Sequence, residues 1–384
     1  MGEVSLAKVV EDTDESPPYI TYIIAHIQRC GFQLNQQTEL VTSTHIKQPN
    51  HRLIGLEWVK TTPPRWRIEV VTSKEKEKII TLFNQVFKPN QMSSAFWEWK
   101  YGQGRGLGIL AWHQNQLIAH YGGILREIRC FGQSKIAVQI TDVMVDVKER
   151  GVLTRQGAFF LVTATFLENY IGYGARTWVG YGFPSHRHVK LAQHLGLYAA
   201  VGEVVELRWP AIVARPHGWT RVRHLHPQES PKEQQLINQL WDKMSITLCQ
   251  ALVGVRDWPY LYHRYLLHPN KHYELLLISR RFIGQALAVV VIDRDHDTCK
   301  IMDFIGDIRF IPLAIYQIRR LAGRWGLRQV HVWITENFVT TFPLEQAEQH
   351  RLGIYIPHNI WAHSFPPNLI ENRWWLTAGD TDFL

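Results

Sequence analysis

The loop Lys148–Gly157 carries the residues of this chain that are best suited to hold a phosphate group. It lies between a strand-like and a helix-like segment and contains Gly151 and Gly157. Its basic side chains are Lys148, Arg150 and Arg155. Glycine lets the backbone approach a ligand closely, and the first N–H groups of a helix point outward without intrahelical partners. Since the helix dipole adds positive potential, the pattern predicts an anion site, although many solvated loops have similar content.

The histidines, cysteines and tryptophans give weaker indications of a functional site than this loop does. The histidines of the stretch 208–231 lack the i, i+4 spacing with a carboxylate that is typical of metal sites, so we expect no metal. They are His217, His224 and His226. The four cysteines are scattered without a C-x-x-C pair, which favours a reducing compartment over a zinc site or a disulfide scaffold. We interpret Trp97, Trp99 and Trp258 as residues that seal a core rather than stack on a ligand.

The elements that must position the loop are readable from periodicity. Alternating apolar residues predict strands at Arg67–Val71, Leu107–Trp112, Gln116–Glu127, Ser134–Val145 and Thr177–Gly182. Helical spacing predicts one helix after Thr72–Ser73 and another along Phe159, Val162, Phe166 and Tyr170. The loop Lys148–Gly157 therefore connects a strand to a helix.

The second half of the chain repeats this order of elements. Trp258 opens an aromatic turn that echoes Trp97, and Asp303 follows Trp258 at the same spacing as Asp142 follows Trp97. The first copy is longer after its aspartate, and the extra residues fall at Lys148–Gly157. We therefore predict two copies of one α/β module with a mixed sheet, of which only the first has a phosphate loop.

Composition limits the class of protein. The chain has 384 residues, 46% hydrophobic and 20% charged, which is globular and favours two domains. The 42 Lys+Arg against 34 Asp+Glu favour an anionic partner, but no basic block indicates nucleic acid. The apolar stretches are too short for a transmembrane segment, and the acidic start is unlike a signal peptide, so we expect a cytoplasmic protein.

Proline-rich stretches set the expected domain boundaries. Residues 1–65, with a possible short helix at Tyr19–Ile27, form an N-terminal appendage that ends at Pro63 and Pro64. Residues 66–208 form the first module, 209–232 a Pro-rich basic linker, and 233–384 the second, degenerate module.

This order of strand, basic loop, helix, strand and closing helix resembles the GNAT superfamily of acyl-CoA-dependent N-acyltransferases. The matching residues are Asp142-Val143-Met144-Val145, Arg150-Gly151, Gly182-Phe183-Pro184-Ser185 and Leu195-Gly196-Leu197. The resemblance covers roughly 66–208 well and 257–384 loosely. In the latter range, Trp374-Trp375-Leu376-Thr377 and Gly379-Asp380-Thr381-Asp382 resemble the ending of a bacterial tandem-GNAT subgroup.

The resemblance implies a bound acyl-CoA, acetyl-CoA or another, as co-substrate. The pantetheine arm would lie along Val143, Met144 and Val145. The pyrophosphate would lie against backbone N–H groups of the loop, whose residues are Arg150, Gly151, Thr154, Arg155, Gln156 and Gly157, with Ser185 nearby or acting as a helix N-cap. The loop departs from the family pattern, because Leu153 stands where the first glycine is usual and Gly157 comes late.

The reaction that the resemblance implies is direct transfer of an acyl group from CoA to a primary amine. Asp142 is the candidate base, with a purely structural carboxylate as the alternative. Ala192 stands where the family has its usual acidic tyrosine, so Tyr181 and Tyr198 are the substitute candidates for the acid. His186 and His188 could also move protons, but surface positions are the simpler interpretation.

Three functions remain open from the sequence: an N-acyltransferase, a catalytically inactive GNAT-like protein that binds acyl-CoA or a partner, and a basic nucleic-acid-binding protein. We favour the first. The acceptor would be an amine on a small molecule, a saccharide or a peptide, and neither its identity nor the oligomeric state is encoded in a readable motif.

Overall fold

The computed structural model describes residues 4–12, 32–40, 51–60, 65–172, 174–362 and 364–381. The chain divides into two compact units. One contains Met1–Val86, Gly108–Tyr121 and Met144–Phe166, and the other Phe87–Leu107, Gly122–Val143 and Leu167–Leu384. The helix predicted at Tyr19–Ile27 lies outside the described residues, as does Asp382.

The N-terminal segment contains a small antiparallel sheet in the order β1-β3-β2. Its strands are β1 (Val4–Asp12), β2 (Phe32–Leu40) and β3 (His51–Lys60). Both outer strands pair with β3 in antiparallel register.

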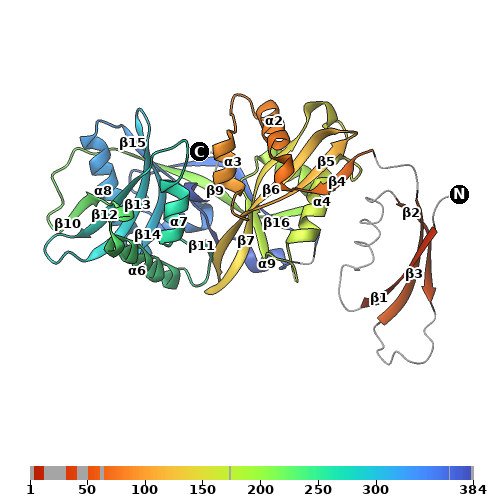
Figure 1. Ribbon diagram of the computed structural model, residues 1–384. Helices are drawn as coiled ribbons and strands as arrows, with labels where there is room; N and C mark the ends of the chain where they lie inside the picture. Colours follow the sequence, from red (N-terminus) through yellow and green to blue (C-terminus); the bar gives the residue numbers. More distant parts are fainter. Residues whose placement is uncertain are drawn as a thin grey trace. The chain divides into compact units, whose positions relative to one another are not determined.

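The first of two larger sheets is built from the strands predicted for the first module (Figure 1). They are β4 (Arg67–Val70), β5 (Gly106–His113), β6 (Gln116–Cys130), β7 (Gln133–Val145) and β8 (Val179–Gly182). Short turns join β5 to β6 and β6 to β7, whereas β8 pairs with β7 in parallel after a helical crossover. This mixed sheet confirms the predicted α/β class.

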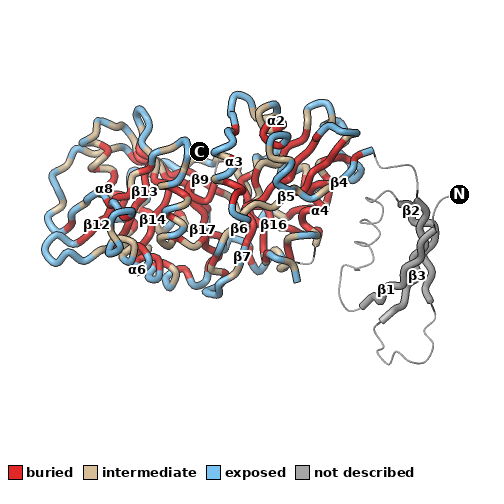
Figure 2. Tube along the Cα trace, viewed as in Figure 1, coloured by how far each residue is buried: buried red, intermediate tan, exposed pale blue. Residues whose placement is uncertain are grey.

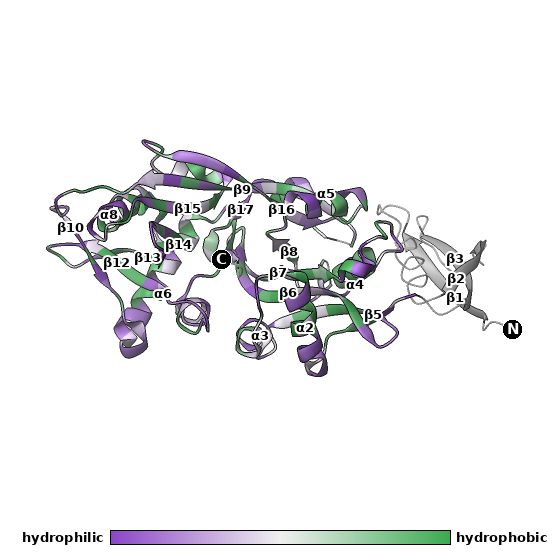
Figure 3. Ribbon diagram, turned by 90° about the horizontal axis from the view of Figure 1, so that it is seen from above, coloured by the Kyte–Doolittle hydropathy of each residue, from purple (hydrophilic) through white to green (hydrophobic). Residues whose placement is uncertain are grey.

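Four helices belong to the same part of the sequence: α2 (Lys76–Val86), α3 (Ser94–Tyr101), α4 (Ala158–Tyr170) and α5 (His186–His194). The hydroxyl of Thr72 and the carboxylate of Glu75 form a capping box before α2, as the predicted helix start requires. Helix α4 is hydrophobic along most of its length, and α5 is hydrophilic (Figure 3). Helix α4 can therefore be buried over much of its surface, whereas α5 can bury only a narrow face.

The second large sheet has the strand order β10-β12-β13-β14-β15-β9-β16. Its strands are β9 (Tyr198–Pro210), β10 (Thr220–His224), β12 (Glu274–Arg280), β13 (Ala286–Arg294), β14 (Thr298–Gly306), β15 (Gln329–Thr335) and β16 (Glu348–Asn359). Strands β12, β13 and β14 are antiparallel neighbours and β15 is parallel to β14, which repeats the succession β5 to β8. The order of elements expected from the repeat is confirmed.

Helices of the second half are α6 (Pro231–Thr247), α7 (Trp258–Leu261), α8 (Ile311–Arg324) and α9 (Pro367–Ile370). A π-type turn, Tyr262–Leu266, continues α7. In the part of the chain that the structure describes, no helix is both long and apolar enough to cross a membrane.

The two halves of the chain exchange strands. Strand β9, from the first predicted module, pairs with β15 and β16 in the second large sheet. In return, β11 (Leu252–Gly254) pairs with β6, and β17 (Trp374–Trp375) pairs with β11. The predicted linker 209–232 contains β10, which pairs with β12. Each large sheet therefore contains strands from both predicted modules.

The core follows from these pairings. Strands β13 and β14 are buried along most of their length and are drawn red in Figure 2. The largest fully buried side chains include Trp209, Trp374 and Trp375. Trp97 is buried, as predicted, and Trp258 packs against the core while partly exposed.

Trp99 and His263 of the π-type turn each use a ring nitrogen to contact the backbone carbonyl oxygen of the other. Its indole N–H donates to the carbonyl oxygen of His263 at 2.8 Å, and its ring stacks on the imidazole with centroids 5.5 Å apart. Burial, together with the charge of Arg105, lowers the pKa of His263 to about 4.

This pKa predicts an acid-sensitive contribution to stability. The unfolded chain binds the proton near pH 6.5, whereas the folded chain binds it only near pH 4. Stability is therefore full above pH 6.5 and falls as the pH drops towards 4, by about 1–2 kcal/mol once partial exposure is allowed for. Urea titrations of the wild type and of His263→Gln at several pH values check this, and parallel pH profiles for the two proteins contradict it.

Candidate functional site

Strand β7 separates from β8 shortly before the loop that the sequence singled out. Their parallel pairing runs from Ala137 opposite Val179 to Ile140 opposite Gly182, where β8 ends. Two residues later Asp142 has a φ of 48°, in the left-handed region that non-glycine residues rarely adopt. The strand is locally distorted there, as at a β-bulge, before Val143, Met144 and Val145 complete it.

The loop begins with a tightly bonded turn. Asp146 caps a short 3₁₀ turn, Val147–Glu149, by accepting from the backbone N–H of Lys148 at 2.9 Å. The Nε of Arg150 donates to the carbonyl oxygen of Val145 at 2.9 Å, so the guanidinium folds back on the end of β7. These bonds fix where the loop leaves the strand.

Glu149 anchors the same turn to neighbouring basic groups. It accepts from Arg65 Nη2 at 2.8 Å, and its other oxygen lies 3.0 Å from His113 Nδ1. Burial alone would raise its pKa, but these partners outweigh burial and hold the pKa below its usual value. Glu149 is therefore occupied within the protein.

Gly157 is the residue that closes the loop. Its N–H donates to the carbonyl oxygen of Thr154 at 2.9 Å, and a Cβ at this position would lie only 2.0 Å from the carbonyl oxygen of Val152. A Cβ at Gly151 would meet nothing within 4 Å. The turn thus requires glycine at position 157 and accepts other residues at 151.

The loop between the two glycines is open to solvent. Leu153 is 58% exposed, and Thr154, Arg155 and Gln156 are exposed as well. The chain then enters α4, whose first N–H groups have no helical carbonyl to bond. The segment is accessible rather than covered by neighbouring side chains, and partial positive charge gathers at this helix start.

Asp142 is held by two side chains of α3. Lys100 Nζ lies 2.6 and 2.7 Å from the two carboxylate oxygens, and the hydroxyl of Tyr101 donates to Oδ2 at 2.5 Å. The side chains of Lys100 and Asp142 are only 3% and 7% exposed. Asp142 is a nearly buried carboxylate with a cation on it, and its strained backbone is stabilised by that bonding.

Asp303 has a corresponding arrangement in the second half of the chain. It accepts from Arg256 Nε at 2.6 Å and from the hydroxyl of Tyr265 at 2.6 Å. Tyr260 and Thr377 also donate to it. In both modules, therefore, an aspartate accepts hydrogen bonds from a tyrosine hydroxyl and from a basic side chain. The repeat indicated the aspartate and the aromatic turn, but Arg256 was missed because it lies outside that turn.

Asp380 extends this network and was not singled out by the sequence. Arg256 Nη2 donates to its Oδ2 at 2.5 Å, and the side chains of Arg256, Asp303 and Asp380 are fully buried. Burial by itself would lower the pKa of Arg256, but Asp303 and Asp380 hold it well above its ordinary value. Arg256 stays charged within the core.

The segment Thr377–Asp380 lies where β14 and β15 stop pairing. That pairing ends at Ile301 opposite Val332, and Ile334 then bridges to Thr377. A Cβ on Gly379 would lie 2.1 Å from the hydroxyl oxygen of Tyr265 and 2.5 Å from Asp303 Oδ2. In the second module the chain itself therefore packs against the strand ends.

The candidate tyrosines lie on different sheets. Tyr181 is in β8, opposite Gln139, and its ring packs on Trp374 with centroids 4.8 Å apart. Burial raises its pKa above the ordinary value, and its hydroxyl has no hydrogen-bond partner among the described residues. Tyr198 begins β9 in the second large sheet, where it pairs with Asn359. Both are buried.

Ser185 occupies the N-cap position of α5, as one interpretation predicted. Its hydroxyl lies 2.9 Å from His188 Nδ1 rather than on a backbone N–H, and its backbone bridges to Ile354. Ala192 is fully buried in α5, so a side chain at that position faces the core.

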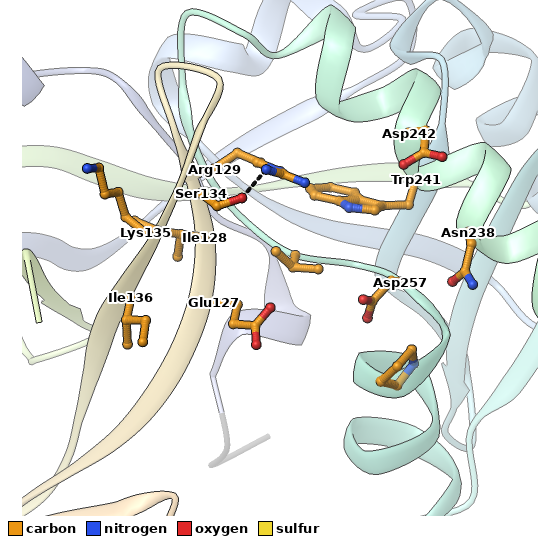
Figure 4. Close-up of a pocket in the computed structure, with 12 residues that line it drawn as sticks. Glu127, Ile128, Arg129, Ser134, Lys135, Ile136, Asn238, Trp241, Asp242 and Asp257 are labelled. Carbon is orange, nitrogen blue, oxygen red and sulfur yellow. Dashed lines mark hydrogen bonds between the residues drawn. The ribbon is translucent and has the colours of Figure 1, made fainter.

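A separate cavity of about 410 Å³ opens at the start of β7 (Figure 4). The end of the β6–β7 hairpin, α6 and the start of α7 line it, and Trp241 and Asn238 reach it from α6. Three carboxylates and two cations surround it: Glu127, Asp242, Asp257, Arg129 and Lys135. It contains none of the predicted site residues, and no local pattern indicates it, because its lining comes from three distant segments.

No group of three or more metal-ligating side chains gathers within the described ranges.

Comparison with known proteins identifies the fold. No family model and no curated protein matches the chain. Among solved structures, a probable N-acyltransferase from Enterococcus faecalis is similar over 76% of this chain and 71% of its own, at 14% identity and a TM-score of 0.56. A GCN5-related N-acetyltransferase from Anabaena variabilis is similar over 77% and 73%, at 11% identity and a TM-score of 0.56.

A third structure, a GCN5-related N-acetyltransferase from Kribbella flavida, covers 76% of this chain and 71% of its own at 13% identity, with a TM-score of 0.50. Identities this low establish the fold alone. The chain has the GNAT fold, which confirms the resemblance at the level of the fold and leaves activity to be argued from the site.

Proposed function

We propose that the chain is an acyl-CoA-dependent N-acyltransferase, with acetyl-CoA as the first donor to test, and that its CoA site lies along the end of β7. The observation that carries the proposal is the parting of β7 from β8 at Ile140, followed at once by an exposed loop closed by Gly157. A parted strand offers free backbone groups to an extended arm, and a helix start favours a phosphate.

Each part of the donor then has a place on one continuous stretch of chain. The pantetheine arm lies along Val143, Met144 and Val145. The pyrophosphate lies against the loop and the start of α4, with Arg150, Gly151, Thr154, Arg155, Gln156 and Gly157 around it and Ser185 contributing at α5. Since β14 and β15 are packed with Thr377–Asp380 instead, the second module takes no donor.

The proposed reaction is a single transfer. The neutral amine of the acceptor attacks the thioester carbonyl, the C–N bond forms as the C–S bond breaks, and CoA leaves as a thiol. Asp142 is the proposed base, acting with Lys100 and Tyr101 on its carboxylate. Tyr181 and Tyr198 are the proposed proton donors to sulfur. The acceptor is a primary amine on a small molecule, a saccharide or a peptide.

Asp142→Asn tests the role of the carboxylate. We expect acetyl-CoA affinity to be unchanged and kcat to fall about 100-fold or more, because a base is lost while the side chain keeps its shape. Calorimetric titration measures the affinity, and the pH profile of kcat/KM shows whether a titrating base has disappeared. If affinity and melting temperature fall while the pH profile keeps its form, Asp142 has a structural role only.

The function itself is tested in two steps. Isothermal titration with acetyl-CoA establishes donor binding, and the absence of heat and of thermal protection contradicts the proposal. A thiol-release assay over a panel of small, saccharide and peptide amines then separates an enzyme from an inactive binder. Ala192, where an acidic tyrosine is usual, is the feature that favours the inactive alternative.

A further inference from the structure

An apolar tip projects from the edge of the second large sheet. It consists of Trp219, just before β10, and of Phe282 and Ile283 in the β12–β13 turn. Their side chains are 74%, 75% and 72% exposed. The Trp219 and Phe282 rings meet edge to face with centroids 6.0 Å apart, so the two segments form one patch.

The backbone holds this tip in place. The N–H of Arg281 donates to the carbonyl oxygen of Trp219 at 2.8 Å, and the turn closes through the N–H of Gly284, which donates to Arg280 at 3.1 Å. Gly284 has a φ of 68°, which glycine adopts without strain. The turn is drawn pale blue in Figure 2, whereas β12 and β13 below it are buried. Folding therefore gains little from these three side chains, although exposed apolar side chains reduce solubility.

Positive charge surrounds the tip. Arg280 and Arg281 immediately precede Phe282, and Arg215 lies in the segment that leads to Trp219. All three side chains are exposed, and none forms an ion pair within the described part of the chain. Among the described residues, Arg221 Nε donates to the hydroxyl of Ser279 at 3.3 Å and to no carboxylate. Since no carboxylate neutralises these guanidinium groups, the tip attracts anions.

We propose that this tip binds the surface of an anionic membrane. Trp and Phe side chains insert at the headgroup boundary, and arginines beside them contact lipid phosphates. The patch consists of three apolar side chains, whereas each partner in a stable protein interface contributes about 20–30 residues. A single-stranded nucleic acid favours bases stacked in a groove, so a projecting turn with an aliphatic Ile283 suits lipid better.

Sedimentation with vesicles tests the proposal on the full chain. We expect binding to vesicles of equal parts phosphatidylcholine and phosphatidylglycerol, and little binding to phosphatidylcholine alone. The triple variant Trp219→Ser, Phe282→Ser, Ile283→Ser should bind at least about tenfold more weakly, since apolar insertion is lost. The double variant Arg280→Gln, Arg281→Gln should lose the preference for anionic vesicles.

A matched control changes exposed residues elsewhere. Ile246 is 71% exposed and Arg187 is exposed, so Ile246→Ser with Arg187→Gln removes an apolar group and a charge away from the tip. This control should bind like the wild type. No binding to either vesicle, equal binding by the triple variant, or displacement from vesicles by a short oligonucleotide overturns the proposal.

Discussion

Arg256→Ala is expected to lower the free energy of unfolding by about 3–5 kcal/mol, because it leaves the buried Asp303 without a cation and leaves Asp380 with only Arg126, at 3.9 Å. Its guanidinium bonds Asp303 and Asp380, and the three side chains are fully buried. A buried carboxylate that loses its cation is not hydrated in exchange, so the free-energy cost of its desolvation is no longer offset. Urea denaturation at neutral pH measures the change.

Arg309→Ala is the matched control for that substitution. Arg309 also pairs with an aspartate, Asp307, at 2.6 Å, but its side chain is 81% exposed. Water screens this pair, so the change in unfolding free energy should lie within experimental error. Similar losses in the two variants would mean that burial of the Arg256 network does not determine its contribution.

Gly157→Ala should weaken acyl-CoA binding at least about tenfold, equivalent to roughly 1.4 kcal/mol or more. The added Cβ would lie 2.0 Å from the carbonyl oxygen of Val152, so the turn from Thr154 must open and its N–H groups must move. Because the proposed contact with pyrophosphate is made by the backbone, a shift of this turn acts on affinity directly. Isothermal titration with acetyl-CoA is the measurement.

Gly151→Ala supplies the comparison on the same loop. Nothing lies within 4 Å of a Cβ at that position, so the affinity of this variant should match that of the wild type. Melting temperatures of both variants show whether the fold is intact. Equal affinities in Gly157→Ala and the wild type would place the donor away from this loop.

Local patterns in the sequence were sufficient to predict the secondary-structure elements of the first module and the loop Lys148–Gly157. Alternation and helical spacing predicted β4 to β8 and α4, because each depends on neighbouring residues. The repeat placed Asp303 in correspondence with Asp142, and both aspartates indeed accept from a tyrosine. Gly151 and Gly157 were both predicted to let the backbone approach a ligand closely, whereas the structure gives a steric need for glycine only at 157, from the carbonyl oxygen of Val152.

What the sequence could not provide is the choice of distant partners. Strand β9 alternates like any strand, and nothing in its residues shows that it pairs with β15 and β16. Arg256 and Asp380 lie 124 positions apart, so their ion pair has no local signature. Strand pairing and buried ion pairs are non-local, so local patterns of residues do not show which segments meet.

The position of Thr377–Asp380 has a consequence for how the protein is made. Trp374 pairs beside Leu252, and Thr377 bridges to Ile334, so the last described segment completes both large sheets. On the ribosome these residues emerge after β11 and β15, and until then Arg256 and Asp303 lack Asp380. Before Asp380 is available, Arg256 and Asp303 can pair only with each other, so the complete buried network forms last.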